Sequence, residues 1–105
     1  MNWANFQTHN DSPERAFESM CNQLFERWCR RTFGNEVQSF RAINGAGGDG
    51  GVEAYAQLKN GDGIGHQAKW FSNSIEDLQI RQIHGSVTTA KKVRPQIKYY
   101  VICVP

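Results

Sequence analysis

The sequence predicts a single α/β domain whose elements follow the order helix, three strands, helix, strand. Residues 13–33 carry apolar side chains at helical spacing, and residues 52–71 contain two runs of alternating apolar and polar side chains joined by a glycine-rich turn. After a second helical pattern, residues 97–104 are almost continuously apolar, which is typical of a strand covered on both faces. We therefore expect a mixed sheet flanked by helices, with the last strand beside an early strand and reached through a crossover helix.

The composition fits one compact domain. Of the 105 residues, 39% are hydrophobic and 21% are charged, and the net charge is +2. This length suits a single core, and no apolar run approaches the roughly 18 residues that cross a bilayer. The amino terminus lacks the basic start and the apolar stretch of a secretory signal, so we expect a cytoplasmic protein with reduced thiols.

Three cysteines without paired spacing are expected to be core residues: Cys21, Cys29 and Cys103.

The first helix is predicted to begin at Pro13. The serine before it can cap free amides, proline suits the first helical position, and Glu14 places an acid in the first turn. Gly34 stands where a helix of about 20 residues would stop. The apolar face is expected to consist of Phe17, Met20, Cys21, Leu24, Phe25 and Trp28. Residues 1–12 are assigned to an N-terminal arm, and residues 13–105 to the domain core.

Three strands are predicted between the helices. Residues 36–43 form a short mixed candidate, and residues 52–58 alternate in the period-two pattern of a half-buried strand. Residues 64–71 continue that pattern after a hairpin turn at 59–63. Before the second strand, residues 45–51 contain five glycines in seven positions, which lets the main chain approach a ligand or another strand closely.

The second helix is predicted to start at a Ser74 cap and to stop before Pro95. Its apolar face is expected to consist of Ile80, Ile83, Val87 and Ala90. The apolar strand that follows runs almost to Pro105, where the sequence ends. We therefore expect the chain to be a fragment of a longer multidomain protein.

An acidic side chain is expected between the first helix and the edge of the sheet. At 100° per residue, Glu18 falls between Phe25 and Cys29 on the helical wheel. Glu14 lies one turn earlier on the same side. Because buried acids without partners are rare, Glu18 either belongs to a functional site or lies at the boundary and pairs with an arginine.

Three polar side chains are expected on one face of the second and third strands. Alternation turns Glu53 away from the apolar residues on either side of it, and it turns Gln67 and Lys69 together away from theirs. If the hairpin loop spans residues 60–62, Glu53 pairs with Lys69 and their Cβ atoms lie about 5 Å apart. The ordinary alternative is a surface hairpin that carries a Glu–Lys pair.

Such a cluster suits metal-assisted hydrolysis of a phosphodiester. Carboxylate oxygens of Glu53 or Asp49, with the side-chain carbonyl of Gln67, are ligands that Mg²⁺ prefers, and Mn²⁺ is expected to substitute. Glu18 is placed to bind a second ion or its waters. Lys69 can position an attacking water and offset negative charge on the phosphorane-like transition state.

These residues carry a resemblance to a known family. Phe17-Glu18, then Gly48-Asp49-Gly50-Gly51-Val52-Glu53, then Gln67-Ala68-Lys69 resemble, in order and spacing, the Mrr-like branch of the PD-(D/E)xK nuclease superfamily, which has the restriction endonuclease-like fold. The segments GGDGGVE and QAKWF look especially like the N-terminal effector nucleases of large bacterial antiviral STAND ATPases. The similarity covers residues 17–104.

The resemblance implies an α-β-β-β-α-β core and a Mg²⁺-dependent deoxyribonuclease that cuts double-stranded DNA. It makes Glu18 the acid of the first helix, and Gln67 and Lys69 the Q-x-K variant of the third motif. The acid of the second motif is Asp49 or Glu53. Many Mrr-like sequences have aspartate at the second position, but its place just inside the strand favours Glu53. Because one domain offers one active site, we also expect self-association through the rest of a longer chain. No membrane partner is expected, since no apolar run could cross a bilayer.

Two other functions stay open. A nuclease-fold module that binds nucleic acid or protein without cutting is one, because Glu53 and Gln67 depart from the commoner motif. A resolvase-like, structure-selective nuclease that shares the core and the site is the other.

His66 alternates toward the Ala68 face and is expected to be a packing residue. Basic residues near the helix ends either contact phosphates or lie on solvated faces: Arg27, Arg30, Arg31, Lys91, Lys92, Arg94 and Lys98.

Overall fold

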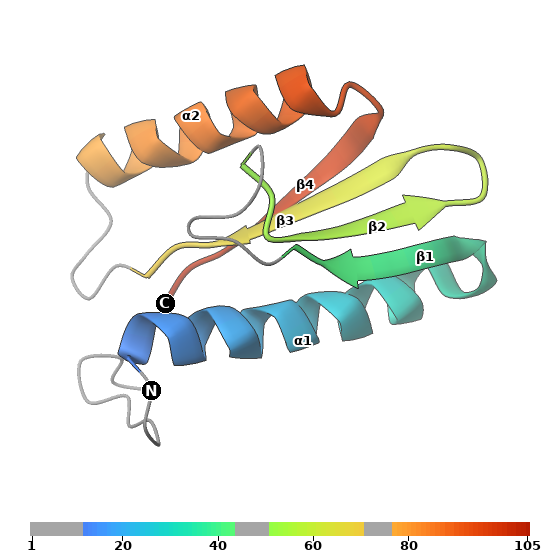
Figure 1. Cartoon of the computed structure of the whole chain (residues 1–105), viewed down its shortest axis with the longest axis horizontal. Helices are drawn as coiled ribbons and strands as arrows, with labels where there is room; N and C mark the ends of the chain where they lie inside the picture. Colours follow the sequence, from blue (N-terminus) through green and yellow to red (C-terminus); the bar gives the residue numbers. More distant parts are fainter. Residues whose placement is uncertain (1–11, 44–50, 71–76) are drawn as a thin grey trace.

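The structure is a computed structural model that describes residues 12–43, 51–70 and 77–105. In chain order its elements are α1 (Pro13–Phe33), the 3₁₀ helix η2 (Gly34–Glu36), β1 (Val37–Ala42), β2 (Ala54–Leu58), β3 (Gly63–Ala68), α2 (Asp77–Val93) and β4 (Ile97–Cys103). They form an α/β domain with a four-stranded mixed sheet between the two α-helices (Figure 1), which confirms the expected order of helices and strands. Nearly all of the N-terminal arm, most of the glycine-rich segment and the Ser74 cap lie outside the described residues.

The ends of α1 match the predicted ends. The Ser12 side chain accepts a hydrogen bond of 3.1 Å from the N–H of Arg15, and Pro13 occupies the first turn. At the other end, Gly34 has a φ of 53° and its N–H donates to the carbonyl of Arg30. Glycine tolerates this positive φ, so the chain can leave the helix there without strain.

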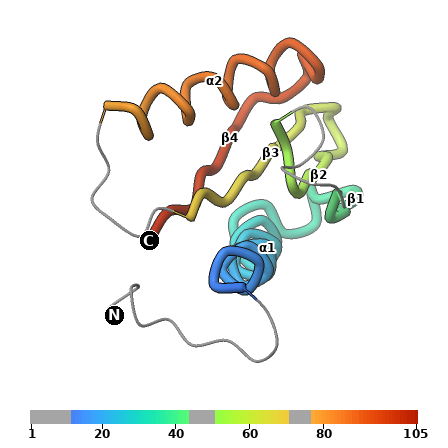
Figure 2. The backbone as a smooth tube through the Cα atoms, turned by 60° about the vertical axis from the view of Figure 1, so that its left-hand side comes forward, coloured from blue at the N-terminus to red at the C-terminus, as the bar shows by residue number. Residues whose placement is uncertain are grey.

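The sheet has the order β1-β2-β3-β4. The first three strands pair antiparallel, and β4 pairs parallel with β3. The crossover from β3 through α2 to β4 confirms the expected helical connection, and the neighbour of the last strand is the strand directly before the crossover. Figure 2 shows α1 and α2 on opposite faces of the sheet.

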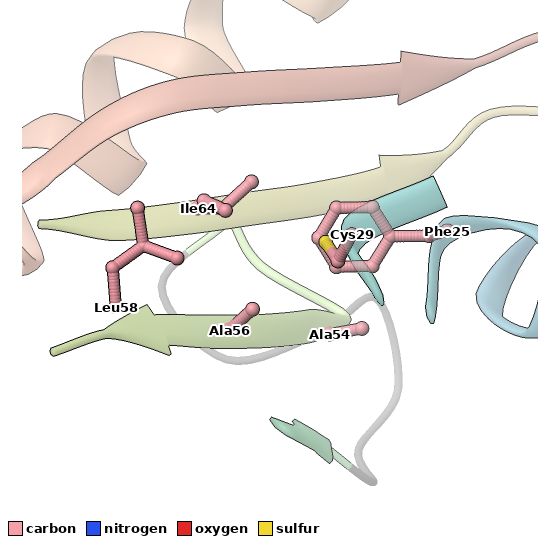
Figure 3. Packing of buried hydrophobic residues seen from close by; sticks show 6 residues of the cluster. All are labelled: Phe25, Cys29, Ala54, Ala56, Leu58 and Ile64. Carbon is pink, nitrogen blue, oxygen red and sulfur yellow. The ribbon is translucent and has the colours of Figure 1, made fainter. Parts of the chain in front are cut away.

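The main core lies between α1 and the β2–β3 hairpin. Its buried residues are Phe25, Cys29, Ala54, Ala56, Leu58 and Ile64 (Figure 3). The two alanines of β2 leave room for the large Phe25 ring, whose burial contributes about 1.5–3 kcal/mol. Cys21 is buried in a neighbouring cluster and Cys103 packs partly buried against that cluster, so the expectation that the cysteines are core residues is largely confirmed.

The α2 side of the sheet is covered less completely than expected. Of the four apolar residues predicted to face the core, only Ala90 is buried, whereas Ile80 and Val87 are 43% and 37% exposed. In β4 only Ile97 is buried, so the prediction that this strand is covered on both faces is wrong for the described chain. The reason is that β4 lies at the edge of the sheet and α2 packs there through the turn around Ala90.

The second strand begins two residues later than predicted. Glu53 lies in a bend, and Val52 and Ala54 belong to clusters on opposite faces of the sheet, so the expected alternation is wrong at this point. The main chain holds the bend from both sides. The N–H of Ile43 donates to the Glu53 carbonyl at 2.7 Å, and the N–H of Glu53 donates to the His66 carbonyl at 2.8 Å. The third strand likewise ends earlier than predicted, at Ala68.

The hairpin loop comprises residues 59–61 rather than the expected 60–62. The N–H of Leu58 donates to the Asp62 carbonyl across the base of the loop. Gly61, the last loop residue, has a φ of 94°, which supplies the left-handed conformation that three-residue hairpin loops need.

The register of the hairpin is therefore two residues from the predicted one. Ala54 lies opposite His66, and continuing the pairing places Glu53 level with Gln67, not with Lys69. A shift by two residues leaves every side chain on the same face of the strand. Gln67 and Lys69 therefore stay together, whereas Glu53 reaches them from the bend before β2, where the alternation is broken.

Gly51 fits a close contact with α2, and we expect Gly51→Ala to lower the free energy of unfolding by about 1–3 kcal/mol. Gly51 has a φ of 76°, and an added Cβ would lie 2.7 Å from the Ser86 carbonyl oxygen. Urea denaturation measures the change. Gly85→Ala is the matched control, because a Cβ at Gly85 meets nothing within 4 Å and alanine favours a helix interior. Unchanged stability of Gly51→Ala would contradict this account.

Candidate active site

The predicted polar residues meet where β3 ends. Glu53 lies in the bend before β2. Gln67 is the second-to-last residue of β3, and Lys69 follows that strand. Glu18 lies near the start of α1 and is half-buried. The N–H of Lys69 donates to the carbonyl of Cys103 at 2.9 Å, so β4 holds the main chain at Lys69 in place.

Glu53 carries a buried carboxylate that accepts a hydrogen bond from the main chain. The residue is 6% exposed, and its Oε2 accepts a hydrogen bond of 2.7 Å from the N–H of Ala68. Burial raises the pKa of Glu53, the bond from Ala68 opposes that rise, and the charge of Glu18 adds to it. A carboxylate in this state gains from any nearby positive charge, whether a proton, an ammonium group or a metal ion.

Glu18 lies in the same electrostatic environment. Burial raises the pKa of Glu18, the charge of Glu14 raises it further, and Lys69 opposes the rise more than Arg15 does. Lys69 acts on Glu53 in the same direction. Two carboxyl groups and one ammonium group from three parts of the chain therefore influence one another, an arrangement common at functional sites.

Tyr100 of β4 is a neighbour of the site that the sequence analysis did not single out. Its hydroxyl donates to the Gly51 carbonyl and lies 2.9 Å from the side-chain amide of Gln67. Burial, with a smaller contribution from Glu53, raises the pKa of Tyr100 to about 12. The hydroxyl thus stays protonated at neutral pH. One signal was present in the sequence, since a tyrosine in a largely apolar strand needs a partner for its hydroxyl.

His66 and Cys21 lie close by but belong to the packing. His66 is 1% exposed, its ring stacks on Phe25 with 4.7 Å between ring centres, and its Nδ1 lies 3.1 Å from the Val101 carbonyl oxygen. This confirms the packing interpretation of His66. Burial raises the pKa of the Cys21 thiol, so the thiolate needed for reactivity is disfavoured.

The basic side chains near the end of α2 lie away from the site. Because β3 and β4 are parallel, the start of β4 is at the end of the sheet remote from Lys69. There the Lys91 ammonium donates to the Ile97 carbonyl at 3.0 Å, and Lys98 Nζ lies 3.8 Å from Asp62 Oδ2. These contacts give both lysines a structural role, and contact with phosphates stays a prediction.

The side chains of this site carry oxygen atoms of the kind that hard divalent cations bind. Glu18 and Glu53 supply carboxylates, Gln67 supplies an amide oxygen, and Mg²⁺ commonly keeps several waters beside one or two carboxylates. Among residues 12–43, 51–70 and 77–105, no group of three or more His, Cys, Asp or Glu side chains is arranged to hold a metal ion. Glutamine is not one of those types, and Asp49, the alternative second-motif acid, lies outside the described residues.

Comparisons with protein-family models, with curated proteins and with solved structures found no match to this chain. Within the described part of the chain, neither helix is both long and apolar enough to span a membrane.

Proposed function

We propose that this chain is a metal-dependent endonuclease domain that hydrolyses phosphodiester bonds of double-stranded DNA. The observation that supports this most is the position of Lys69, whose Nζ lies 3.1 Å from the Gln67 amide and whose charge opposes the rise that burial causes in the pKa of both Glu18 and Glu53. The order α1-β1-β2-β3-α2-β4 agrees with the restriction endonuclease-like core that the Mrr-like resemblance implies.

The residues fall into two roles. Glu18, Glu53 and Gln67 would hold Mg²⁺ or Mn²⁺, which supplies an acidified water and polarises a phosphoryl oxygen. Lys69 would hydrogen-bond the attacking water and offset the charge that develops on the phosphate. In hydrolysis the water oxygen forms a new bond to phosphorus as one bridging P–O bond breaks, and the departing sugar oxygen ends as a hydroxyl with the proton that the water loses.

The proposal extends to the setting of the domain. Its resemblance to effector nucleases of antiviral STAND ATPases supports a cytoplasmic role in bacterial defence against phage. One domain offers one such site, so two copies held together would cut both strands of a duplex in a single event. Self-association of the domain would provide them.

A module that binds without cutting is the second candidate, and Gln67 is the observation that favours it. A neutral amide at this position lowers the negative charge available to a cation, and burial already disfavours the charged form of Glu53. Such a module would bind DNA duplexes in a gel-shift assay and leave them intact with Mg²⁺.

We expect the Glu53→Gln variant to lose at least about 100-fold of the cleavage rate on supercoiled plasmid. The amide oxygen of glutamine can still accept the hydrogen bond from Ala68, so the change removes charge and keeps the local structure. The assay compares Mg²⁺, Mn²⁺ and EDTA at high and low protein concentration. Glu36→Gln, an exposed change in η2, is the matched control.

Nicking or linearisation that needs metal and is lost only in Glu53→Gln supports the nuclease. Cleavage that persists in EDTA, or that is equal in the two variants, contradicts the proposed role of Glu53. Intact plasmid in every condition, together with duplex binding, supports the second candidate.

A further inference from the structure

The buried amide of Gln67 can face in two directions, and its neighbours decide between them. Gln67 is 4% exposed, and its amide lies 2.9 Å from the Tyr100 hydroxyl. That hydroxyl has one proton, and it donates this proton to the Gly51 carbonyl, which can only accept. Tyr100 must therefore accept a hydrogen bond from Gln67, and the Gln67 nitrogen must point toward Tyr100.

With the nitrogen on this side, each polar atom of the amide has a complementary partner. The nitrogen lies 3.0 Å from Ser86 Oγ and 3.2 Å from the Gly51 carbonyl oxygen, and Lys69 Nζ donates to the amide oxygen at 3.1 Å. The reverse orientation places the amide oxygen against the Gly51 carbonyl and the NH₂ group against an ammonium. Both contacts are repulsive, and buried polar groups without suitable partners are costly.

We propose that Tyr100 and Ser86 are positioning residues that hold the Gln67 carbonyl oxygen toward Lys69 and the cation site. That a cation uses this oxygen rests on the proposed function, whereas the orientation of the amide does not. The proposal gives a physical reason for glutamine at this position. A glutamate would turn an oxygen toward the Gly51 carbonyl, where only a donor fits.

The orientation is testable without metal or DNA, by NMR of the Gln67 side-chain amide. Its ¹H–¹⁵N signals are assigned as those missing in Gln67→Glu. In the parent chain we expect protection from exchange with solvent. In Tyr100→Phe and Ser86→Ala we expect shifted signals and exchange about tenfold faster, since each change removes one hydrogen bond. Tyr99→Phe, at a residue 41% exposed on the same strand, and Thr88→Ala on the exposed side of α2 are the matched controls.

A titration with Mg²⁺ alone, followed by the same amide signals, tests the link to the cation site. We expect Tyr100→Phe and Ser86→Ala to weaken binding about tenfold and the two controls to leave it unchanged. Ser86→Ala is the milder change, so it keeps the test valid if Tyr100→Phe does not fold. The dispersion of the backbone amide spectrum shows which variants are folded.

The outcomes separate the two proposals. An amide that shifts in both variants supports the positioning role, and if Mg²⁺ then fails to bind the parent chain, only the metal-dependent function is overturned. An amide whose shifts and exchange are the same in Ser86→Ala, Tyr100→Phe and the controls overturns the positioning role, even if the parent chain binds Mg²⁺ and cuts DNA.

Discussion

Lys69→Ala is expected to reduce the rate of metal-dependent plasmid cleavage by at least about 100-fold, the loss typical when a charge-stabilising group is removed from an active site. Lys69 is the positive charge that acts on both Glu18 and Glu53, and its Nζ lies 3.1 Å from the Gln67 oxygen. No other residue type can place a flexible ammonium at this point. The measurement is the initial rate of nicking with Mg²⁺ or Mn²⁺.

The fold should survive this change, because the hydrogen bond that fixes the strand end comes from the main chain of Lys69 to Cys103. Lys59→Ala, in the exposed hairpin loop, removes a lysine of the same charge remote from the site and is the control. Mg²⁺ binding should separate the roles. It is expected to persist in Lys69→Ala, since an ammonium is not a ligand, and to weaken in Glu53→Gln. Equal cleavage by Lys69→Ala and the parent would falsify the assignment.

Local signals in the sequence predict the elements of this fold well. The first helix is bounded by a serine cap and a C-terminal glycine, and both act within one turn of the residues they cap. The position of the hairpin loop is harder to predict, because residues 59–61 and residues 60–62 both favour a turn. Only the positive φ of Gly61 and the pairing of Leu58 with Asp62 distinguish them. The exposure of α2 depends on what covers the sheet edge, which periodicity does not reveal.

The candidate site was predictable in its residue types but not in its neighbours. Alternation predicts that Glu53 and Gln67 share a cluster, but the bend at Glu53 breaks the alternation, and it is the observed register that brings Glu53 level with Gln67. The bend at Glu53 and the link from Gln67 to Tyr100 and Ser86 are long-range contacts that no spacing encodes. They depend on how β4 and α2 pack after the hairpin has formed.

His66 is expected to make the fold sensitive to acid. Burial lowers the pKa of His66 to about 4, with the hydrogen bond to Val101 opposing the shift, whereas an unfolded histidine has a pKa of 6.5. Between these values the unfolded chain binds a proton that the folded chain does not. The contribution of His66 to the free energy of unfolding is therefore fully present above pH 6.5. It is lost as the pH decreases toward 4, and the loss is about 3 kcal/mol.

The acidic residues of the site act in the opposite direction. Burial raises the pKa of both Glu18 and Glu53, so the folded chain holds their protons to higher pH than the unfolded chain does. Each contributes stability that is present at low pH and is lost as the pH rises through its folded pKa. The total pH profile of the parent chain therefore mixes opposing contributions, and only a comparison between variants isolates His66.

The comparison uses urea denaturation at steps from pH 7.5 to 4 for the parent, His66→Phe and His66→Gln. Either substitution changes the stability at pH 7, because His66 stacks on Phe25 and donates from Nδ1 to the Val101 carbonyl. The informative quantity is the decrease in the free energy of unfolding as the pH is lowered. This decrease should be smaller in both variants than in the parent, by about 3 kcal/mol. His84→Gln, on the exposed surface of α2, should follow the parent profile. Parallel profiles for the parent and both His66 variants would contradict this prediction. They would mean that His66 binds its proton equally well in the folded and the unfolded chain.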